Sequence, residues 1–141
     1  MTGGPDLSAP QVVTITSDAD VVRVRQLVRT VAVAVKLSLV DQTKLVTAAS
    51  ELARNTLVYG GGGGAEVGLV DSGRRKGVRI AFSDDGPGIS DLDLALTDGY
   101  TSGGGLGLGL GGARRLVDEF EIDTGAGRGT RITITKWARS V

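Results

Sequence analysis

The spacing of apolar and polar positions in the first half of the chain predicts one strand followed by two helices. Residues Gln11 to Ser17 are rich in β-branched side chains, which favours a strand. From Asp20 to Leu39 the valines recur at helical spacing. Part of this segment also alternates as a strand would, but its length and its lack of turn residues favour a helix. Asp41 to Tyr59 begins with a residue that can cap a helix and is followed by Gly60, which predicts a second helix.

The second half of the chain is predicted to form two pairs of strands with two short helices between the pairs. A polar turn interrupts the first pair and a glycine-rich turn the second. The predicted elements are strands at Ala65 to Asp71 and Gly77 to Asp84, helices at Asp91 to Thr97 and Ala113 to Phe120, and strands at Glu121 to Thr124 and Thr130 to Trp137. Because strands and helices do not alternate, this order argues for an α+β fold with helices on one face of a sheet.

The length of the chain and the position of its polar and glycine-rich segments predict one domain with a short tail. Residues 1–10 are polar and carry no apolar periodicity, so we expect a disordered tail there and a single domain at 11–141. The five consecutive glycines Gly60 to Gly64 are not expected in any regular element. A flexible linker is the simplest interpretation of that run, and its length suggests no catalytic role.

Composition excludes several kinds of chemistry. The chain has no histidine and no cysteine, which removes imidazole catalysis, phosphohistidine, disulfides and thiolate metal sites. Its 16 basic and 16 acidic residues give no net charge, so neither a nucleic acid nor a membrane surface is an expected partner. The longest apolar stretch, Val31 to Val40, contains Lys36 and is too short to span a bilayer. We therefore expect a cytoplasmic protein.

The first candidate site is on the second predicted helix. Glu51 and Asn55 are four residues apart and therefore point the same way. An amide oxygen can take one place on Mg²⁺, a nearby carboxylate can accept a proton from a hydroxyl, and Arg54 can donate to phosphate. The alternative is that these three residues form the solvated face of an amphipathic helix.

The second candidate follows a predicted strand. Asp84 is placed at the strand end, where it can accept a hydrogen bond from an exocyclic amine, while Gly86 and Gly88 allow close approach of a ligand. The alternative is an ordinary turn, because Asp, Gly and Pro all favour turns.

The third candidate is a glycine-dense loop ahead of a helix. Exposed backbone N–H groups in such a loop can bind phosphates. The residues concerned are Gly103, Gly104, Gly105, Leu106, Gly107, Leu108 and Gly109. Gly107 to Gly112 matches G-x-G-x-x-G, but a dinucleotide fold would need that motif directly after a strand, and here residues 98–102 precede it. The chain has no P-loop motif and no histidine for a eukaryotic-type kinase motif.

These features occur in an order that chance would rarely supply, and the order resembles the GHKL ATP-binding superfamily. Glu51 to Asn55 is similar to its N box, Asp84 to Gly88 to its D-x-G-x-G box, Gly105 to Gly109 to its lid box, and Gly129-Thr130 to its last motif. Within the superfamily, the phrases ELARN, DGYTSGGGLGLGL, GARRLVDEFEI and GRGT are similar to the RsbT-type switch kinases of bacterial stress signalling.

The resemblance spans about Val12 to Trp137 and implies both a fold and a site. The implied fold is the Bergerat ATP-binding fold, a single-domain two-layer sandwich with a mixed, mostly antiparallel sheet and helices on one face. The resemblance further implies ATP and Mg²⁺ as cofactors. It implies Glu51 as the base for the substrate hydroxyl, Asn55 on Mg²⁺, Asp84 on the adenine amine with Thr130 nearby, and the lid glycines on the phosphates.

The same resemblance implies the partners. The family phosphorylates STAS-domain proteins on Ser or Thr in large signalling complexes, and the released kinase activates a PP2C-type phosphatase. The main alternative is an anti-sigma factor that binds ATP and sequesters a sigma factor. Tyr59 argues against that alternative, because anti-sigma relatives often have His there. A domain without a nucleotide would require all of these motifs to be turns, caps and linkers by coincidence.

Overall fold

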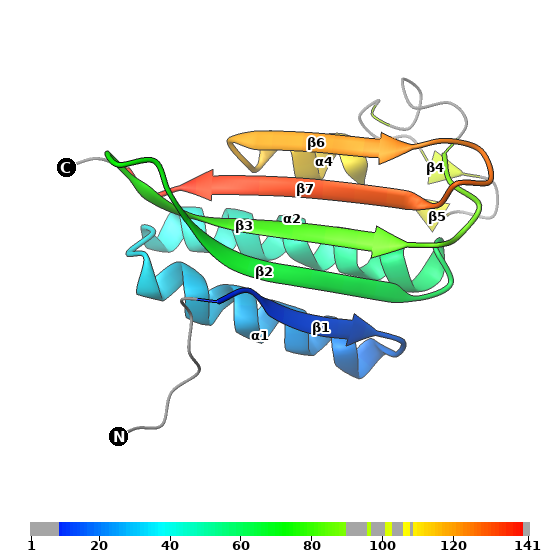
Figure 1. Cartoon of the computed structure of the whole chain (residues 1–141), viewed down its shortest axis with the longest axis horizontal. Helices are drawn as coiled ribbons and strands as arrows, with labels where there is room; N and C mark the ends of the chain where they lie inside the picture. The colour runs from blue at the N-terminus through cyan, green and yellow to red at the C-terminus, as the bar shows by residue number, and fades with distance from the viewer. Residues whose placement is uncertain (1–8, 90–95, 97–100, 103–105, 108, 140–141) are drawn as a thin grey trace.

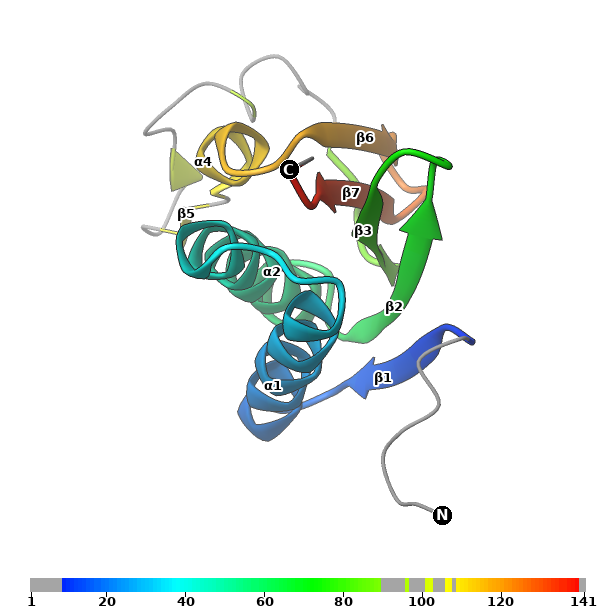
Figure 2. The ribbon, with the colours of Figure 1, turned by 90° about the vertical axis from the view of Figure 1, so that its left-hand side faces the viewer.

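The computed structural model describes residues 9–89, 96, 101–102, 106–107 and 109–139. These form two layers, with an antiparallel sheet on one side and helices on the other (Figures 1 and 2). The elements are β1 (Gln11–Ile15), α1 (Asp18–Ala34), α2 (Leu39–Val58), β2 (Gly63–Asp71), β3 (Lys76–Asp84), β4 (Thr101–Ser102), β5 (Leu106–Gly107), α4 (Leu110–Arg115), β6 (Glu119–Thr124) and β7 (Thr130–Trp137).

The main sheet has the strand order β1-β2-β3-β7-β6, and every neighbouring pair in it is antiparallel. The predicted α+β sandwich is therefore confirmed, with a sheet that is antiparallel throughout rather than mixed. Strand β7 pairs with β3 on one side and with β6 on the other. This arrangement brings the end of β3 at Asp84 opposite Thr130, where β7 begins.

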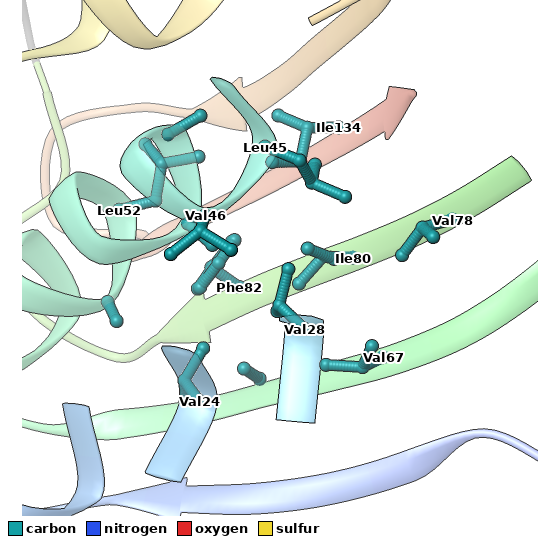
Figure 3. Close-up of a cluster of buried hydrophobic side chains, with 14 of the residues drawn as sticks. Val24, Val28, Leu45, Val46, Leu52, Val67, Val78, Ile80, Phe82 and Ile134 are labelled. Atoms are coloured by element: carbon teal, nitrogen blue, oxygen red, sulfur yellow. The ribbon is translucent and has the colours of Figure 1, made fainter. Parts of the chain in front are cut away.

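The core lies between α1, α2 and the covered face of the sheet, and aliphatic side chains fill it (Figure 3). Valines of α1 and leucines of α2 point toward alternate residues of the strands, as the helical and strand periodicities require. Fully buried members include Val24, Val28, Leu45, Leu52, Val67, Val78, Ile80 and Ile134. Phe82 is the large aromatic member of this cluster and is 2% exposed.

The junction between the two long helices differs from the sequence prediction. Helix α1 ends at Ala34 rather than Leu39, because Lys36 adopts a left-handed conformation with φ 64° and the N–H of Leu37 bonds back to Ala32. Ser38, not Asp41, caps α2 by accepting a hydrogen bond from the Asp41 N–H. Four residues that looked helical from their spacing are therefore the turn that reverses the chain.

Three further predicted boundaries are wrong. Gly63 and Gly64 belong to β2, because they pair with β1 on one side and β3 on the other. Helix α4 begins at Leu110 after the left-handed Gly109 (φ 65°) and stops at Arg115. The Asp118 N–H then bonds to Thr135, which pulls Glu119 and Phe120 into β6.

Some predictions fall on parts of the chain that the structure does not describe. The predicted helix at Asp91 to Thr97 lies outside the described residues, apart from Leu96. The same holds for residues 1–8 of the predicted tail, while Pro10 lies beside Gly68 of β2. Within the described residues, no helix is both long and apolar enough to cross a membrane.

Candidate functional site

Helix α2 carries the first set of predicted site residues on its C-terminal half. Asn55 is half-buried, whereas Glu51 and Arg54 are exposed. Glu51 and Asn55 are one turn apart, but only Asn55 lines the cavity at this end of the sheet. Arg54 does not line it. The alternative of a simply solvated helix face therefore fails for Asn55.

Asp84 is the last residue of β3 and begins the turn that contains Gly86 and Gly88. Its Oδ1 accepts a hydrogen bond of 2.9 Å from the Gly86 N–H, which holds the carboxylate over its own turn. Burial raises the pKa of Asp84 and the neighbouring Asp85 charge raises it further, while the Gly86 hydrogen bond acts in the opposite direction. The net effect is a pKa above the ordinary value of 3.8.

Thr130 lies opposite Asp84 at the start of β7, and Thr124 of β6 holds it in place. Thr124 Oγ1 accepts a hydrogen bond from the Ile89 N–H at 2.9 Å and donates to the Gly129 carbonyl at 3.0 Å. The hydroxyls of Thr124 and Thr130 are 2.9 Å apart. Thr124 thereby joins the β6–β7 hairpin to the loop after Asp84. Thr124 has no motif of its own in the sequence, and its only signal there is its place opposite Thr130 in the predicted hairpin.

One cavity brings the predicted residues together from α2, β3 and β7. Its polar lining includes Asn55, Asp84 and Thr130, and its volume of about 20 Å³ leaves room for about one water molecule. The remaining lining residues are Leu52, Thr56, Tyr59, Phe82, Ile89, Leu110 and Ile132. A carboxylate and a hydroxyl at the rim of apolar walls can bind a flat ring that carries an amine donor, once the walls move apart to admit it.

Tyr59 extends from the end of α2 across the cavity to the Asp84 turn. Its hydroxyl donates to the Gly88 carbonyl over 3.4 Å. In the sequence Tyr59 is distinctive only as a departure from anti-sigma relatives, because a tyrosine at a helix end has no pattern that indicates a role. In the structure it links the two segments that carry Asn55 and Asp84.

Only part of the predicted glycine loop belongs to the described structure. Leu106 and Gly107 form β5, which pairs with β4, and Gly109 precedes α4. Gly103, Gly104, Gly105 and Leu108 lie outside the described residues. Gly109 is close to the predicted base, because a Cβ added there would lie 3.2 Å from Glu51 Cδ. The end of the loop and Glu51 therefore share one region of the surface.

The described residues contain no cluster of three or more acidic side chains that could hold a metal ion by themselves. Asn55 lines the cavity, and the oxygen of a side-chain amide suits Mg²⁺ when phosphate oxygens and waters complete the shell. The donor set therefore fits an ion that arrives with a nucleotide.

The family comparison bears on this geometry. Residues 40–140 match the model of the histidine kinase-, DNA gyrase B- and HSP90-like ATPases. The chain belongs to this family. The match includes α2, the Asp84 turn, α4 and the β6–β7 hairpin, which are the segments that surround the cavity. The predicted GHKL membership is confirmed.

Individual relatives refine the comparison. The chain is 44% identical over 127 residues to the serine/threonine-protein kinase RsbT of Bacillus subtilis (strain 168), covering 90% of this chain and 96% of the relative. It is 34% identical over 122 residues to the anti-sigma F factor of Clostridium novyi (strain NT), covering 79% and 85%. In fold it is similar to the structure of the RsbU and RsbW domains of Rv1364c from Mycobacterium tuberculosis, with a TM-score of 0.62 at 24% identity over 94% of this chain and 33% of that one.

Proposed function

We propose that this chain is an ATP- and Mg²⁺-dependent serine/threonine protein kinase whose substrate is a STAS-domain protein of a bacterial stress-signalling switch. The observation that carries the proposal is that Asn55, Asp84 and Thr130 line one cavity in a chain 44% identical to a named serine/threonine kinase. The catalytic and binding roles below are part of the proposal.

The nucleotide base is assigned to the cavity. The Asp84 carboxylate accepts a hydrogen bond from the exocyclic amine of adenine, and the Thr130 hydroxyl lies beside it. Apolar side chains such as Phe82 and Leu110 contact the faces of the ring. Gly86 and Gly88 do not line the cavity, and a Cβ on either would meet the backbone of Gly60 or Gly125, so these glycines let the turn after Asp84 pack closely beside the site.

The phosphates are assigned to the side of the cavity that Asn55 of α2 and Leu110, the first residue of α4, line. Asn55 takes one place on Mg²⁺, Arg54 donates to phosphate oxygens, and the backbone N–H groups of residues 103–109 bind the remaining oxygens. Bound Mg²⁺ neutralises phosphate charge. Positioning and charge neutralisation supply most of the catalysis of phosphoryl transfer.

Glu51 is assigned the proton transfer. The substrate hydroxyl loses its proton to the Glu51 carboxylate while its oxygen forms a bond to the γ-phosphorus, and the bond from that phosphorus to the β,γ-bridging oxygen breaks to release ADP. Glu51 is exposed and borders Gly109, which leaves it accessible to a protein substrate.

Transfer of radiolabel from γ-labelled ATP to the STAS-domain protein encoded beside this chain tests the function. We expect label on that protein only when the chain, Mg²⁺ and ATP are all present, and its loss when the phosphorylated Ser or Thr is changed to Ala. Tight ATP binding without transfer would overturn the kinase assignment. Activation of a PP2C-type phosphatase is then tested by measuring the activity of that phosphatase with and without this chain.

An anti-sigma factor is the second candidate, and the 34% identity to a named anti-sigma factor favours it. In that case the nucleotide would be a structural ligand that shapes a sigma-binding surface. Retention of a sigma factor on the immobilised chain, together with no labelled STAS protein, would favour this candidate over the kinase.

A further inference from the structure

Gly60, the first residue of the pentaglycine run, lies directly against Asp84. It is buried, and a Cβ added to it would overlap the Asp84 carboxyl carbon and lie 2.5 Å from Oδ2 and 2.6 Å from Cβ. Atoms at such distances cannot coexist, so the position of the carboxylate depends on the missing side chain. A flexible linker would not make such a contact, which excludes that interpretation for Gly60.

Gly60 also meets the turn after Asp84. A Cβ added to Gly86 would lie 2.7 Å from Gly60 Cα and 2.8 Å from its carbonyl oxygen. The Gly86 N–H holds Asp84 Oδ1, so Gly60 and Gly86 border the same carboxylate. A side chain at either glycine would therefore collide with the segment that carries the other or with Asp84.

The backbone of Gly60 is hydrogen-bonded to the helix that carries Asn55. Its N–H donates to the Asn55 carbonyl over 2.9 Å. Three residues later, Gly63 pairs with Asp84 in the β2–β3 ladder, and a Cβ there would overlap the Ser83 carbonyl oxygen. The chain from Asn55 to Gly63 is thus held at both ends of the short segment that contacts Asp84.

We propose that Gly60 is a positioning residue that sets the Asp84 carboxylate in the cavity and thereby determines selection of adenine over guanine. The inference rests on the nucleotide site of the proposed function. A carboxylate accepts a hydrogen bond from the 6-amino group of adenine, whereas guanine presents a carbonyl oxygen at that position, which a carboxylate repels. Moving the carboxylate therefore removes the preference as well as the affinity.

The chain offers a matched control for this position. Gly60 has no positive φ, so alanine at 60 changes contact with Asp84 without forcing the backbone into the left-handed region. Its neighbour Gly61 is the reverse case, with φ 77° and no atom within 4 Å of an added Cβ. Gly61→Ala therefore tests backbone strain in the same segment without the collision.

The experiment is calorimetric titration of the full chain with Mg-ADP and Mg-GDP, comparing wild type, Gly60→Ala and Gly61→Ala. We expect wild type to prefer ADP, Gly60→Ala to lower that preference about 10-fold or more, and Gly61→Ala to keep it within about 3-fold. The ratio of the two affinities is the readout because partial unfolding lowers both apparent affinities by the same factor. A variant that is merely less stable therefore leaves the ratio unchanged.

A double variant shows whether the effect passes through Asp84. In an Asp84→Asn background, Gly60→Ala is expected to change the ADP-to-GDP ratio by less than about 3-fold, because no carboxylate remains to be displaced. Wild type that binds neither nucleotide would overturn the proposed function itself. Wild type that prefers ADP, with the same preference in Gly60→Ala, would overturn only the role of Gly60.

Discussion

Asp41 at the start of α2 and Lys136 near the end of β7 form an interior ion pair, with Oδ1 and Nζ 3.7 Å apart and side chains 2% and 8% exposed. Arg139 donates to Asp41 Oδ2 over 3.1 Å, and Lys136 also lies 3.4 Å from Asp118 Oδ1. Asp41 Oδ1 has no hydrogen-bond partner among the described residues. The ion pair joins helix and sheet at the end of α2 away from Asn55.

Asp41→Asn is expected to lower the free energy of unfolding by about 3 kcal/mol. The change keeps the size of the side chain but leaves the buried Lys136 ammonium with only the more exposed Asp118. Urea unfolding followed by circular dichroism measures the effect. Arg139→Ala is the control, because the Arg139 side chain is 76% exposed and should contribute less than about 1 kcal/mol. Equal midpoints for wild type and Asp41→Asn would contradict this account.

The stabilisation from Asp41 should disappear in acid. Burial raises the pKa of Asp41, but the Arg139 hydrogen bond and the Lys136 and Arg139 charges outweigh it, so the pKa lies below 3.8. Asp20 has a lowered pKa as well, chiefly because the Thr16 N–H donates to it. Such carboxylates stabilise the fold fully above about pH 3.8 and less as the pH falls through their folded pKa values.

Thermal melts of wild type and Asp41→Asn at a series of pH values test whether the stabilisation from Asp41 is lost as the pH falls. We expect the gap in melting temperature to be constant near neutral pH and to narrow below about pH 3.8. If the difference in melting temperature already narrows between pH 5 and 7, a group other than Asp41 is responsible for the pH dependence.

Local pattern was sufficient for most of the fold and insufficient for its long-range ion pairs. Valine spacing in α1, the polar turn between β2 and β3 and the turn after Asp84 are properties of neighbouring residues, and the corresponding elements form, although α1 ends earlier than predicted. Asp41 was predicted to cap a helix, but its charge is paired with Lys136, which the chain brings back only through β7. No periodicity in the sequence could have revealed that pairing.

Some features of the candidate site could likewise be predicted from the sequence, and others could not. Asn55, Asp84 and Thr130 carry recognisable motifs, and the structure gathers them in one cavity. The contact of Gly60 with Asp84 could not be predicted, because a glycine run has no side chains to form a pattern and its close approach depends on the β2–β3 pairing. The predicted roles of these three cavity residues stay predictions, as do those of Glu51 and Arg54.

Asp84→Asn is expected to weaken Mg-ADP binding about 10- to 100-fold, because an amide replaces the charged acceptor for the adenine amine. Asp85→Asn is the matched control, since Asp85 is adjacent, exposed and outside the cavity lining. Calorimetric titration at neutral pH compares the two. Similar losses in both variants would indicate a general charge effect and not a contact with the base.

The raised pKa of Asp84 predicts a pH dependence of nucleotide affinity. Burial and the Asp85 charge favour the protonated form, so affinity in wild type should begin to fall at a pH above the 3.8 of an ordinary aspartate. Asp85→Asn should shift that fall to lower pH. Fluorescence titration with a labelled ADP from pH 7 to pH 4.5 avoids the range in which Asp41 loses its charge. A fall in affinity at the same pH in wild type and in Asp85→Asn would contradict the effect assigned to the Asp85 charge.

Asn55→Ala is expected to remove most of the gain in ATP affinity that Mg²⁺ provides, because the amide oxygen is the protein ligand assigned to the ion. Titrations of wild type and variant with ATP, with Mg²⁺ and with EDTA, separate this effect from loss of the base contact. Affinity in EDTA should be similar for the two proteins. If Asn55→Ala keeps the full gain in ATP affinity from Mg²⁺, the protein ligand of the ion is another residue.

Glu51→Gln separates chemistry from binding. Glu51 is exposed and does not line the cavity, so we expect Mg-ATP affinity within about 3-fold of wild type. The glutamine cannot accept the hydroxyl proton, so label transfer to the STAS protein should fall about 10²- to 10⁴-fold. Glu66→Gln, an exposed change on β2, controls for the loss of a surface charge. Gly109→Ala should lower transfer as well, because its Cβ would meet Glu51 and because Gly109 is left-handed, whereas Gly112→Ala, with no atom near its added Cβ, should not. Equal transfer by wild type and Glu51→Gln would show that the substrate hydroxyl is deprotonated elsewhere.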